Sequence, residues 1–418
     1  MSETRFDGWR VVAGAFILLG TTSGLAFYNL GLYLTALKDE HGFSEGPLSL
    51  ATVTVFALGG VLGIPIGAYI QRSDPRRLFA VGAAAGAISL YLLGSITEIW
   101  QIYASYALLA LGFATAGLVP TYSIVTRWFD RRRAVAMSIA STGLSTGGIV
   151  FTPLFEWVID EQGLDGAAPW LAIAWVVGIM VPTLFLIRPD PISVGQHPDG
   201  VAPTEPSDGP PQLDGWDFEP AVRTNFFLTV SAAYILVMGS QVGGIVHIFN
   251  LVDGRVGSDT AATAVSIVAF SSIIARLLGG FIATRVALRP FTIVFCFVQA
   301  AGLLLLGNLD GNVGLLAAAA VFGASVGNLL MLQPLLLSGA FGARNYPRIY
   351  ARANAITAIG LVTGPAAIGI LKDALDSYRV PYALAALAAA GAGLVLAVLT
   401  RDPETAGGAD AVPAASAP

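Results

Sequence analysis

The sequence predicts an all-α membrane protein with twelve transmembrane helices in two pseudo-symmetric six-helix bundles. Three observations support this prediction. The 418 residues are 55% hydrophobic and only 12% charged, and the mean hydropathy is +0.72, outside the range of soluble domains. The apolar residues fall into runs long enough to span a bilayer, and the second half of the chain repeats features of the first.

The apolar runs form two sets of six along the chain. Glycine and proline inside them do not argue against helix, because both are common in spanning helices. The first set lies near residues 11–34, 48–70, 78–96, 101–125, 134–157 and 170–187. The second set lies near residues 226–249, 262–284, 291–307, 313–337, 351–371 and 382–400.

The segment between the two sets is rich in Pro, Gly and Asp and has too few apolar residues to pack a core. We therefore expect an N-terminal half over residues 1–187, a cytoplasmic linker over 188–225 and a C-terminal half over 226–402. The composition of residues 403–418 is typical of a disordered tail. The first apolar run is too long for a signal-peptide core, so we expect it to stay in the mature protein.

Basic residues gather on one side of the predicted bundle. If the N-terminus is cytoplasmic, 17 of the 22 lysines and arginines fall on that side and 4 on the other, while Arg276 lies within the membrane. Loops rich in Lys and Arg stay on the cytoplasmic side. This bias predicts an integral protein of the cytoplasmic membrane with both termini inside.

Internal repetition supports two homologous halves. Three residues of the loop near position 70 recur 213 positions later, namely Gly67, Arg72 and Arg76 as Gly280, Arg285 and Arg289. A second set recurs at an offset of 217, namely Arg131, Gly143 and Gly147 as Arg348, Gly360 and Gly364. Solute sites of secondary transporters usually lie between such halves. The spaced glycines predict close helix approach.

This pattern resembles the major facilitator superfamily, whose loop between helices 2 and 3 has a glycine, an acidic residue and spaced basic residues. Here Gln71 stands at the acidic position. Asp7–Trp9, Arg127–Gly148 and Arg276 are similar to the monocarboxylate porters and their oxalate/formate antiporter relatives within it. The resemblance implies that Arg276 binds a substrate carboxylate.

Arg276 is also singled out by its depth. At about 1.5 Å per residue it lies roughly 21 Å from Ala262, where its helix enters, which is too deep for easy snorkelling. A guanidinium offers a planar fork that matches two carboxylate oxygens, and no acidic residue sits mid-membrane to neutralise it. The alternative is a structural arginine bonded to an acid or to backbone carbonyls.

Two departures from the family pattern bear on the ligand. Porters of lactate-like acids carry an acid four positions before this arginine and a lysine in helix 1, where this chain has Ser272 and Asn29. The oxalate exchangers carry a second cation in helix 11, and residues 353–371 contain none. One fixed positive charge suits a monoanion better than a dianion.

Other polar side chains are candidates for the substrate path. They lie at depths where they could face a cavity, although each alone is also typical of a bond between helices: Tyr28, Asn29, Tyr122, Gln241, Ser272 and Asn328. His247, near the outer end of helix 7, is a candidate proton site or an interfacial polar residue. Five loop arginines could form a latch that holds the inward-closed state, or could instead set the membrane topology or bind lipid headgroups: Arg72, Arg76, Arg131, Arg285 and Arg289.

The predicted function is secondary active transport of a small organic monocarboxylate by alternating access about Arg276. We expect a monomer in the lipid bilayer that carries the anion alone, with a proton or in exchange for another anion. The sequence shows no P-loop, metal-ligand cluster or catalytic group, so we expect no enzyme activity, cofactor or nucleic-acid partner. Two alternatives remain, an exporter of amphiphilic compounds and a non-transporting membrane sensor of small acids.

Overall fold

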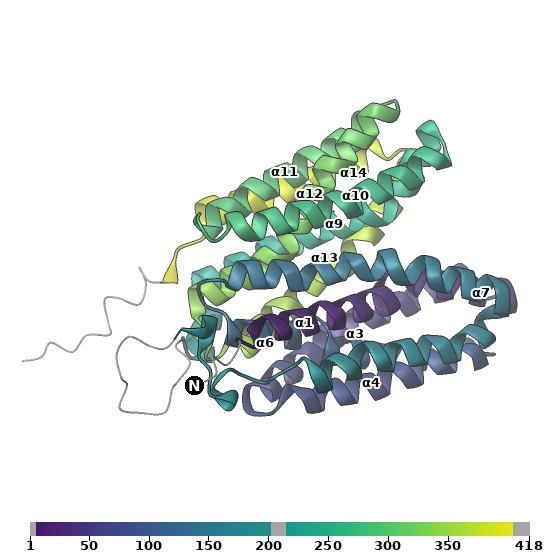
Figure 1. Ribbon diagram of the computed structural model, residues 1–418. Helices are drawn as coiled ribbons and strands as arrows, with labels where there is room; N and C mark the ends of the chain where they lie inside the picture. Colours follow the sequence, from purple (N-terminus) through teal and green to yellow (C-terminus); the bar gives the residue numbers. More distant parts are fainter. Residues whose placement is uncertain (1–5, 202–214, 404–418) are drawn as a thin grey trace, which may run out of the picture.

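The computed structural model describes residues 6–201 and 215–403 (Figure 1). Within these residues, eleven helical stretches are long and apolar enough to cross a membrane. One of them, α7 (Arg133–Phe185), has 53 residues and would measure about 80 Å, more than twice the thickness of the hydrocarbon core. Gly163 interrupts α7 with a φ of 73°, and Figure 1 shows the chain turning back there. Since α7 supplies two spans, the twelve predicted helices are confirmed.

The helix bounds agree with the predicted runs to within seven residues. The first group comprises α1 (Gly8–Ser23), the π-helix η1 (Gly24–Tyr28), α2 (Leu30–His41), α3 (Glu45–Arg72), α4 (Pro75–Leu92), η2 (Leu93–Ser95), α5 (Ile99–Ala116), α6 (Leu118–Trp128) and α7. The second group comprises α9 (Asn225–Val256), α10 (Ser258–Ile282), α11 (Leu288–Asn308), α12 (Asn312–Phe341), α13 (Tyr346–Leu375), α14 (Arg379–Leu394) and the π-helix η5 (Val395–Leu399). The first predicted helix contains the π-turn of η1, and the fourth is broken at Gly117.

Equivalent glycine contacts relate the two groups. A Cβ added to Gly147 of α7 would overlap the backbone carbonyl of Gly20 in α1. A Cβ added to Gly364 of α13 would likewise overlap the carbonyl of Gly239 in α9. Gly147 and Gly364 are 217 positions apart, so the repeat seen in the sequence makes the same close helix contact in each half. The predicted role of these glycines in helix approach is confirmed.

The two groups meet through α3 with α13 and through α7 with α10. Gly67 of α3 faces Ala351 and the carbonyl of Pro347, and Gly280 of α10 faces Ser138 and the carbonyl of Ala134. These contacts lie toward the end of the bundle where the described chain begins, which we call the terminal end. Away from it the groups diverge (Figure 1). The molecule is therefore closed at its terminal end.

The described parts of the predicted linker dock at the terminal end. Residues 188–201, which include η3 (Ile192–Val194) and η4 (Pro198–Gly200), bind the first group, since the Trp128 indole donates to the Arg188 carbonyl at 3.0 Å. Residues 215–223, which include α8 (Phe218–Arg223), bind the second group through Trp216 N–H and the Phe341 carbonyl at 2.9 Å. The remainder of the predicted linker, 202–214, and the predicted tail beyond Pro403 lie outside the described residues.

Candidate functional site

A cavity of about 210 Å³ lies between the two helix groups. Its walls come from α1, η1, α3, α5, α6 and α7 on one side and from α9, α10, α12 and α13 on the other. Among the described residues that line it, Arg276 is the only charged one. Three other predicted binding residues also line it: Tyr28, Gln241 and Ser272. The structure thus brings four of the seven predicted binding residues together around one space.

The guanidinium of Arg276 is fully buried and bonded to both helix groups. Its Nε donates to the carbonyl of Gly327 in α12 at 2.9 Å, and one terminal nitrogen donates to the Ser272 hydroxyl at 3.2 Å. The other terminal nitrogen donates to the carbonyl of Ser141 in α7. Two of these three acceptors are backbone carbonyls, as in the structural alternative named above for Arg276. Packing against α7 and α12 brings two backbone carbonyls to it.

These bonds stabilise the arginine without cancelling its charge. Carbonyls and a hydroxyl are neutral dipoles, and within residues 6–201 and 215–403 no carboxylate forms an ion pair with Arg276. A guanidinium carries five N–H donors, and the three bonds above leave two of them. Arg276 therefore keeps its positive charge and has two N–H donors without an acceptor among the described residues.

Three predicted binding residues do not line the cavity. The Asn328 amide donates to the carbonyls of Ala275 and Ala324 at 2.9 and 3.1 Å, so it joins α12 to α10. Asn29 accepts a bond from the Thr152 hydroxyl at 2.8 Å. The ring of Tyr122 packs 5.9 Å from that of Tyr350 across the two groups. For these three the alternative reading, contact between helices, is correct because each is turned toward a neighbouring helix.

Several polar lining residues were not anticipated from the sequence. The Gln333 amide donates to the Thr357 hydroxyl at 2.8 Å, and the Asn354 amide, which also lines the cavity, makes no hydrogen bond to a described residue. The Oε1 atom of Gln241 is buried without a partner. Asn354, Thr357 and Leu361 are spaced by three and four positions, which places them on one face of α13. From the sequence, this spacing could have predicted that the three residues line the same wall of the cavity.

The predicted arginine latch is wrong for this conformation. Arg76 pairs with Asp74 at 3.3 Å, and Arg285 stacks over Phe281 at 3.9 Å, one turn earlier. Arg289 donates to the carbonyls of Leu396 and Ala397 within its own group. None of the five predicted side chains, Arg72, Arg76, Arg131, Arg285 and Arg289, makes a described hydrogen bond or ion pair across the groups. Groups within their own half contact the side chains of Arg76, Arg285 and Arg289 instead.

Two other side chains close the terminal end. Arg133 at the start of α7 donates to the Ser338 carbonyl of α12 at 3.1 Å. The Gln71 amide donates to the Arg344 carbonyl, and so bridges the last turn of α3 and the loop before α13. Gln71 stands at the position where the resembled family has an acidic residue. In this chain the contact between the groups at this position is therefore a hydrogen bond from a neutral amide.

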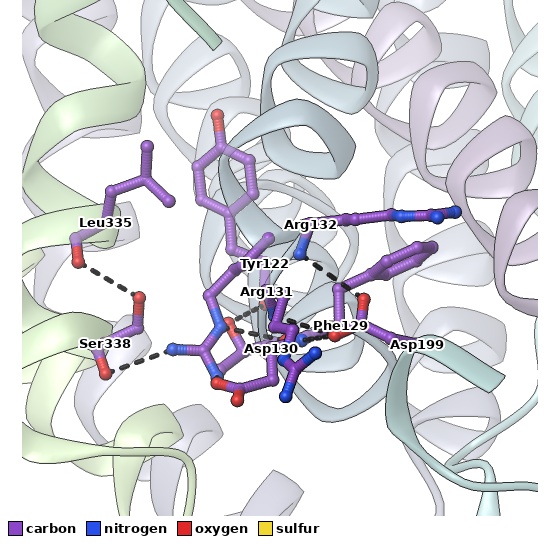
Figure 2. Close-up of polar contacts among 10 residues, drawn as sticks. Tyr122, Phe129, Asp130, Arg131, Arg132, Asp199, Leu335 and Ser338 are labelled. Carbon is purple, nitrogen blue, oxygen red and sulfur yellow. Dashed lines mark hydrogen bonds and ion pairs between the residues drawn. The ribbon is translucent and has the colours of Figure 1, made fainter. Parts of the chain in front are cut away.

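A carboxylate from the linker region supports the same end. Asp199 accepts the backbone N–H groups of Asp130, Arg131 and Arg132 at 3.1, 2.7 and 3.4 Å, and Figure 2 shows it facing this loop. Asp199 adopts a φ of 57°, a left-handed conformation that is strained for a non-glycine residue. The backbone strain is offset by a carboxylate placed at the N-terminus of α7, where negative charge is favourable.

His247 does not line the cavity. Its Nε2 lies 3.0 Å from the Pro365 carbonyl of α13, and its ring centroid lies 5.9 Å from that of Tyr378. A carbonyl can only accept, so Nε2 carries the hydrogen and Nδ1 is the nitrogen left for a proton.

Within the described residues, no group of three His, Cys, Asp or Glu side chains could hold a metal ion.

Comparison with known proteins identifies relatives along nearly the whole chain. The family described as Major Facilitator Superfamily matches residues 16–329 and 221–417. Monocarboxylate transporter 11 of Mus musculus is 26% identical over 388 residues, which cover 90% of this chain and 83% of that protein. Monocarboxylate transporter 13 of Bos taurus is 24% identical over 398 residues, covering 93% and 88%. The MFS transporter asaE of Aspergillus flavus is 26% identical over 336 residues, covering 79% and 71%.

Solved structures share the fold. The human organic anion transporter MFSD10 (TETRAN) superimposes with a TM-score of 0.72 at 14% identity, over 93% of this chain and 99% of that chain. The fucose:proton symporter FucP, in its outward conformation, superimposes with a TM-score of 0.69 at 15% identity, over 94% and 98%. These proteins therefore share the arrangement of helices with this chain. At such low sequence identity the likeness says nothing about the substrate.

Proposed function

Because this chain belongs to the major facilitator superfamily, we propose that it is a secondary transporter that moves a small organic monocarboxylate by alternating access. The observation that carries this proposal is Arg276, the only charged residue among the described residues that line the central cavity. A charge inside a membrane protein costs a few kcal/mol or more unless it is compensated. A bound carboxylate compensates it and can use the two remaining N–H donors.

The arrangement of the helices supports the transport cycle. The two groups touch at the terminal end and diverge beyond it (Figure 1), and the cavity lining extends away from the terminal end, from Arg276 to Val265 along α10. We propose that the terminal end is cytoplasmic, because most basic residues lie there. Residues 1–187 and 226–402 then act as the rocking halves and 188–225 as the linker, in a monomer of the cytoplasmic membrane. The relatives named monocarboxylate transporters support the choice of anion.

Uptake into proteoliposomes tests this function. Purified protein is reconstituted, and uptake of radiolabelled acetate, lactate, pyruvate and hexanoate is measured for wild type, Arg276→Lys and Arg276→Gln. We expect at least a tenfold loss for Arg276→Gln and a smaller loss for Arg276→Lys, which keeps the charge but not the planar fork. Unchanged uptake by Arg276→Gln means that Arg276 does not bind the substrate.

Arg255→Gln is the matched control. Arg255 also donates to backbone carbonyls, those of Leu306, Gly307 and Leu309, but it does not line the cavity. Uptake should survive this substitution if folding is retained. An imposed pH gradient and an internal anion load then distinguish proton symport from exchange and uniport.

One observation favours a second candidate, the exporter of amphiphilic compounds. The three bonds of Arg276 are those of a structural arginine, and most of the cavity wall is apolar. Energy-dependent efflux of amphiphiles that persists in Arg276→Gln would select this candidate. Specific binding of an acid without flux would instead identify a sensor.

A further inference from the structure

The cavity is polar at one end and apolar at the other. Arg276 on α10 and Gln333 on α12 are the lining residues of their helices nearest the terminal end. Asn354 and Thr357 lie toward the terminal end of the α13 wall. Beyond this polar region the wall becomes apolar on all four helices of the second group: Val242, Ile245 and Ile248 on α9, Val265 and Val268 on α10, Val326 on α12 and Leu361 on α13.

The opposite wall is aromatic and aliphatic. The rings of Phe27 and Phe56 meet edge to face with centroids 5.5 Å apart, and Phe27 contacts Tyr28 in the same way at 5.2 Å. Phe113 and Leu144 extend this wall. Along α10, Val265 precedes Arg276 by about 16 Å of helix, so the apolar space continues well past the length of a two- or three-carbon acid.

The charged groups that line the cavity restrict which ligands it can bind. Within its described lining there is one cation and no carboxylate. An ammonium group on the ligand would lose its hydration without an ionic partner, and a second carboxylate would have no second cation. Amino acids and dicarboxylates are therefore disfavoured, while a single carboxylate with an uncharged tail meets a complementary surface at each end.

We infer that this cavity takes monocarboxylates with an apolar tail of about five to nine carbons, aliphatic or aromatic, in preference to short acids such as lactate. This inference rests on the proposed function and specifies the substrate class of the same site. The carboxylate binds Arg276, and the tail runs toward the open end between the Phe27 and Phe56 wall and the valines of α9 and α10.

A homologous series tests the tail. Ligand binding to purified protein is measured by thermal stabilisation and by counterflow in proteoliposomes for acetate, butyrate, hexanoate and octanoate. Each buried methylene should tighten binding about fourfold, equivalent to about 0.8 kcal/mol, until the cavity is filled. Hexanoate should therefore bind at least a hundredfold more tightly than acetate. Equal binding of acetate and hexanoate, or tighter binding of lactate than of hexanoate, overturns the inference and leaves the proposed function standing.

Two matched ligand pairs test the charge. 3-Phenylpropionate and phenylalanine differ by one ammonium group, and hexanoate and adipate differ by one carboxylate. Only the first member of each pair should compete with labelled hexanoate, and equal competition by phenylalanine contradicts the assignment. If no monocarboxylate binds, or if Arg276→Gln leaves binding unchanged, the proposed function fails and the substrate class fails with it.

Variants in the wall connect the effect to this cavity. Phe56→Ala should reduce the gain in affinity per methylene, so that octanoate loses more affinity than acetate, and Phe56→Leu provides a milder change if the alanine variant folds poorly. Phe270→Ala is the control, because Phe270 lies on α10 like Arg276 but is 59% exposed and does not line the cavity. A steep chain-length dependence that survives in both Phe56 variants would place the tail elsewhere and overturn the inference.

Discussion

The guanidinium of Arg276 in α10 donates a hydrogen bond to the backbone carbonyl of Ser141 in α7, so the candidate substrate-binding residue also joins the two helix groups. A carboxylate is a stronger acceptor for a guanidinium than a neutral carbonyl. We expect a carboxylate bound at the two remaining N–H donors to compete with Ser141 for the charge of the guanidinium, and so to weaken one of the contacts that keep α7 against α10.

This competition predicts that substrate loosens the terminal end. Spin labels at cysteines introduced in place of Arg132 and Val286, both exposed and on opposite groups, should show a longer distance distribution when a monocarboxylate is added. In an Arg276→Gln background the distribution should not respond to ligand. A ligand-independent distance in the otherwise wild-type protein would mean that binding and opening are uncoupled.

Arg133→Gln should favour opening of the terminal end. It removes the charged donor that bonds the Ser338 carbonyl, and hydrogen bonds of charged groups contribute about 1.5–3 kcal/mol. We expect about a tenfold or larger shift toward the conformation open at this end, measured by cysteine accessibility in the cleft that Ser338 lines. Arg132→Gln is the control, because Arg132 is exposed and its side chain makes no described bond across the groups. Equal shifts in both variants would point to general loss of positive charge.

Asp199→Ala should destabilise the folded protein. The substitution removes the acceptor of three backbone N–H groups before α7, and loss of a comparable helix cap costs about 1–2 kcal/mol. The apparent unfolding temperature should fall, with Asp199→Asn between the alanine variant and wild type because an amide oxygen still accepts. Asp199→Gly relieves the left-handed φ but also loses the acceptor. A glycine variant as stable as wild type would show that the three bonds add little.

Gly147→Ala and Gly364→Ala should both reduce stability. A methyl group at either position meets a backbone carbonyl of the neighbouring helix, and overpacking of this kind costs about 1–3 kcal/mol. Gly391→Ala in α14 is the control, since nothing lies within 4 Å of the added carbon. Thermal unfolding in detergent and the yield of monodisperse protein measure the effect. Similar losses in all three variants would argue against the close contacts.

His247→Gln tests the candidate proton site. A glutamine amide can replace the Nε2 donor to the Pro365 carbonyl but cannot take up a proton at neutral or mildly acid pH. Thermal stability should remain near that of wild type, while uptake driven by an imposed proton gradient should be lost. His247→Ala controls for the hydrogen bond and should lower stability. Full proton-driven uptake in His247→Gln would assign His247 to a structural role.

Much of the fold followed from local properties of the sequence. The twelve spans, the two repeats and the glycine contacts were predicted because hydropathy, charge and spacing are properties of short segments. Arg276 was identified for the same reason, as the one basic residue far from either end of its apolar run. The broken α5–α6 helix was missed although Pro120 follows Gly117 by three positions, a pattern typical of a helix end, because glycine and proline are both tolerated inside spanning helices.

The site itself was predicted only in part, because a cavity is made by residues that are distant in sequence. Rotation of each helix about its axis decides whether a polar residue faces the cavity or a neighbour, and this separates Gln241 from Asn328. The loop arginines were likewise chosen by position, whereas Arg133 and Gln71 make the bonds because carbonyls of α12 and the following loop lie within their reach.

The sequence by itself determined that this protein crosses the membrane twelve times in two related halves and carries a single basic residue in its interior. Those features depend on composition and on short-range periodicity. Only the tertiary structure decided what surrounds that charge. The carbonyls of Gly327 and Ser141 lie 51 and 135 positions from Arg276, and helix packing alone brings them to its guanidinium and sets the apolar wall beyond it.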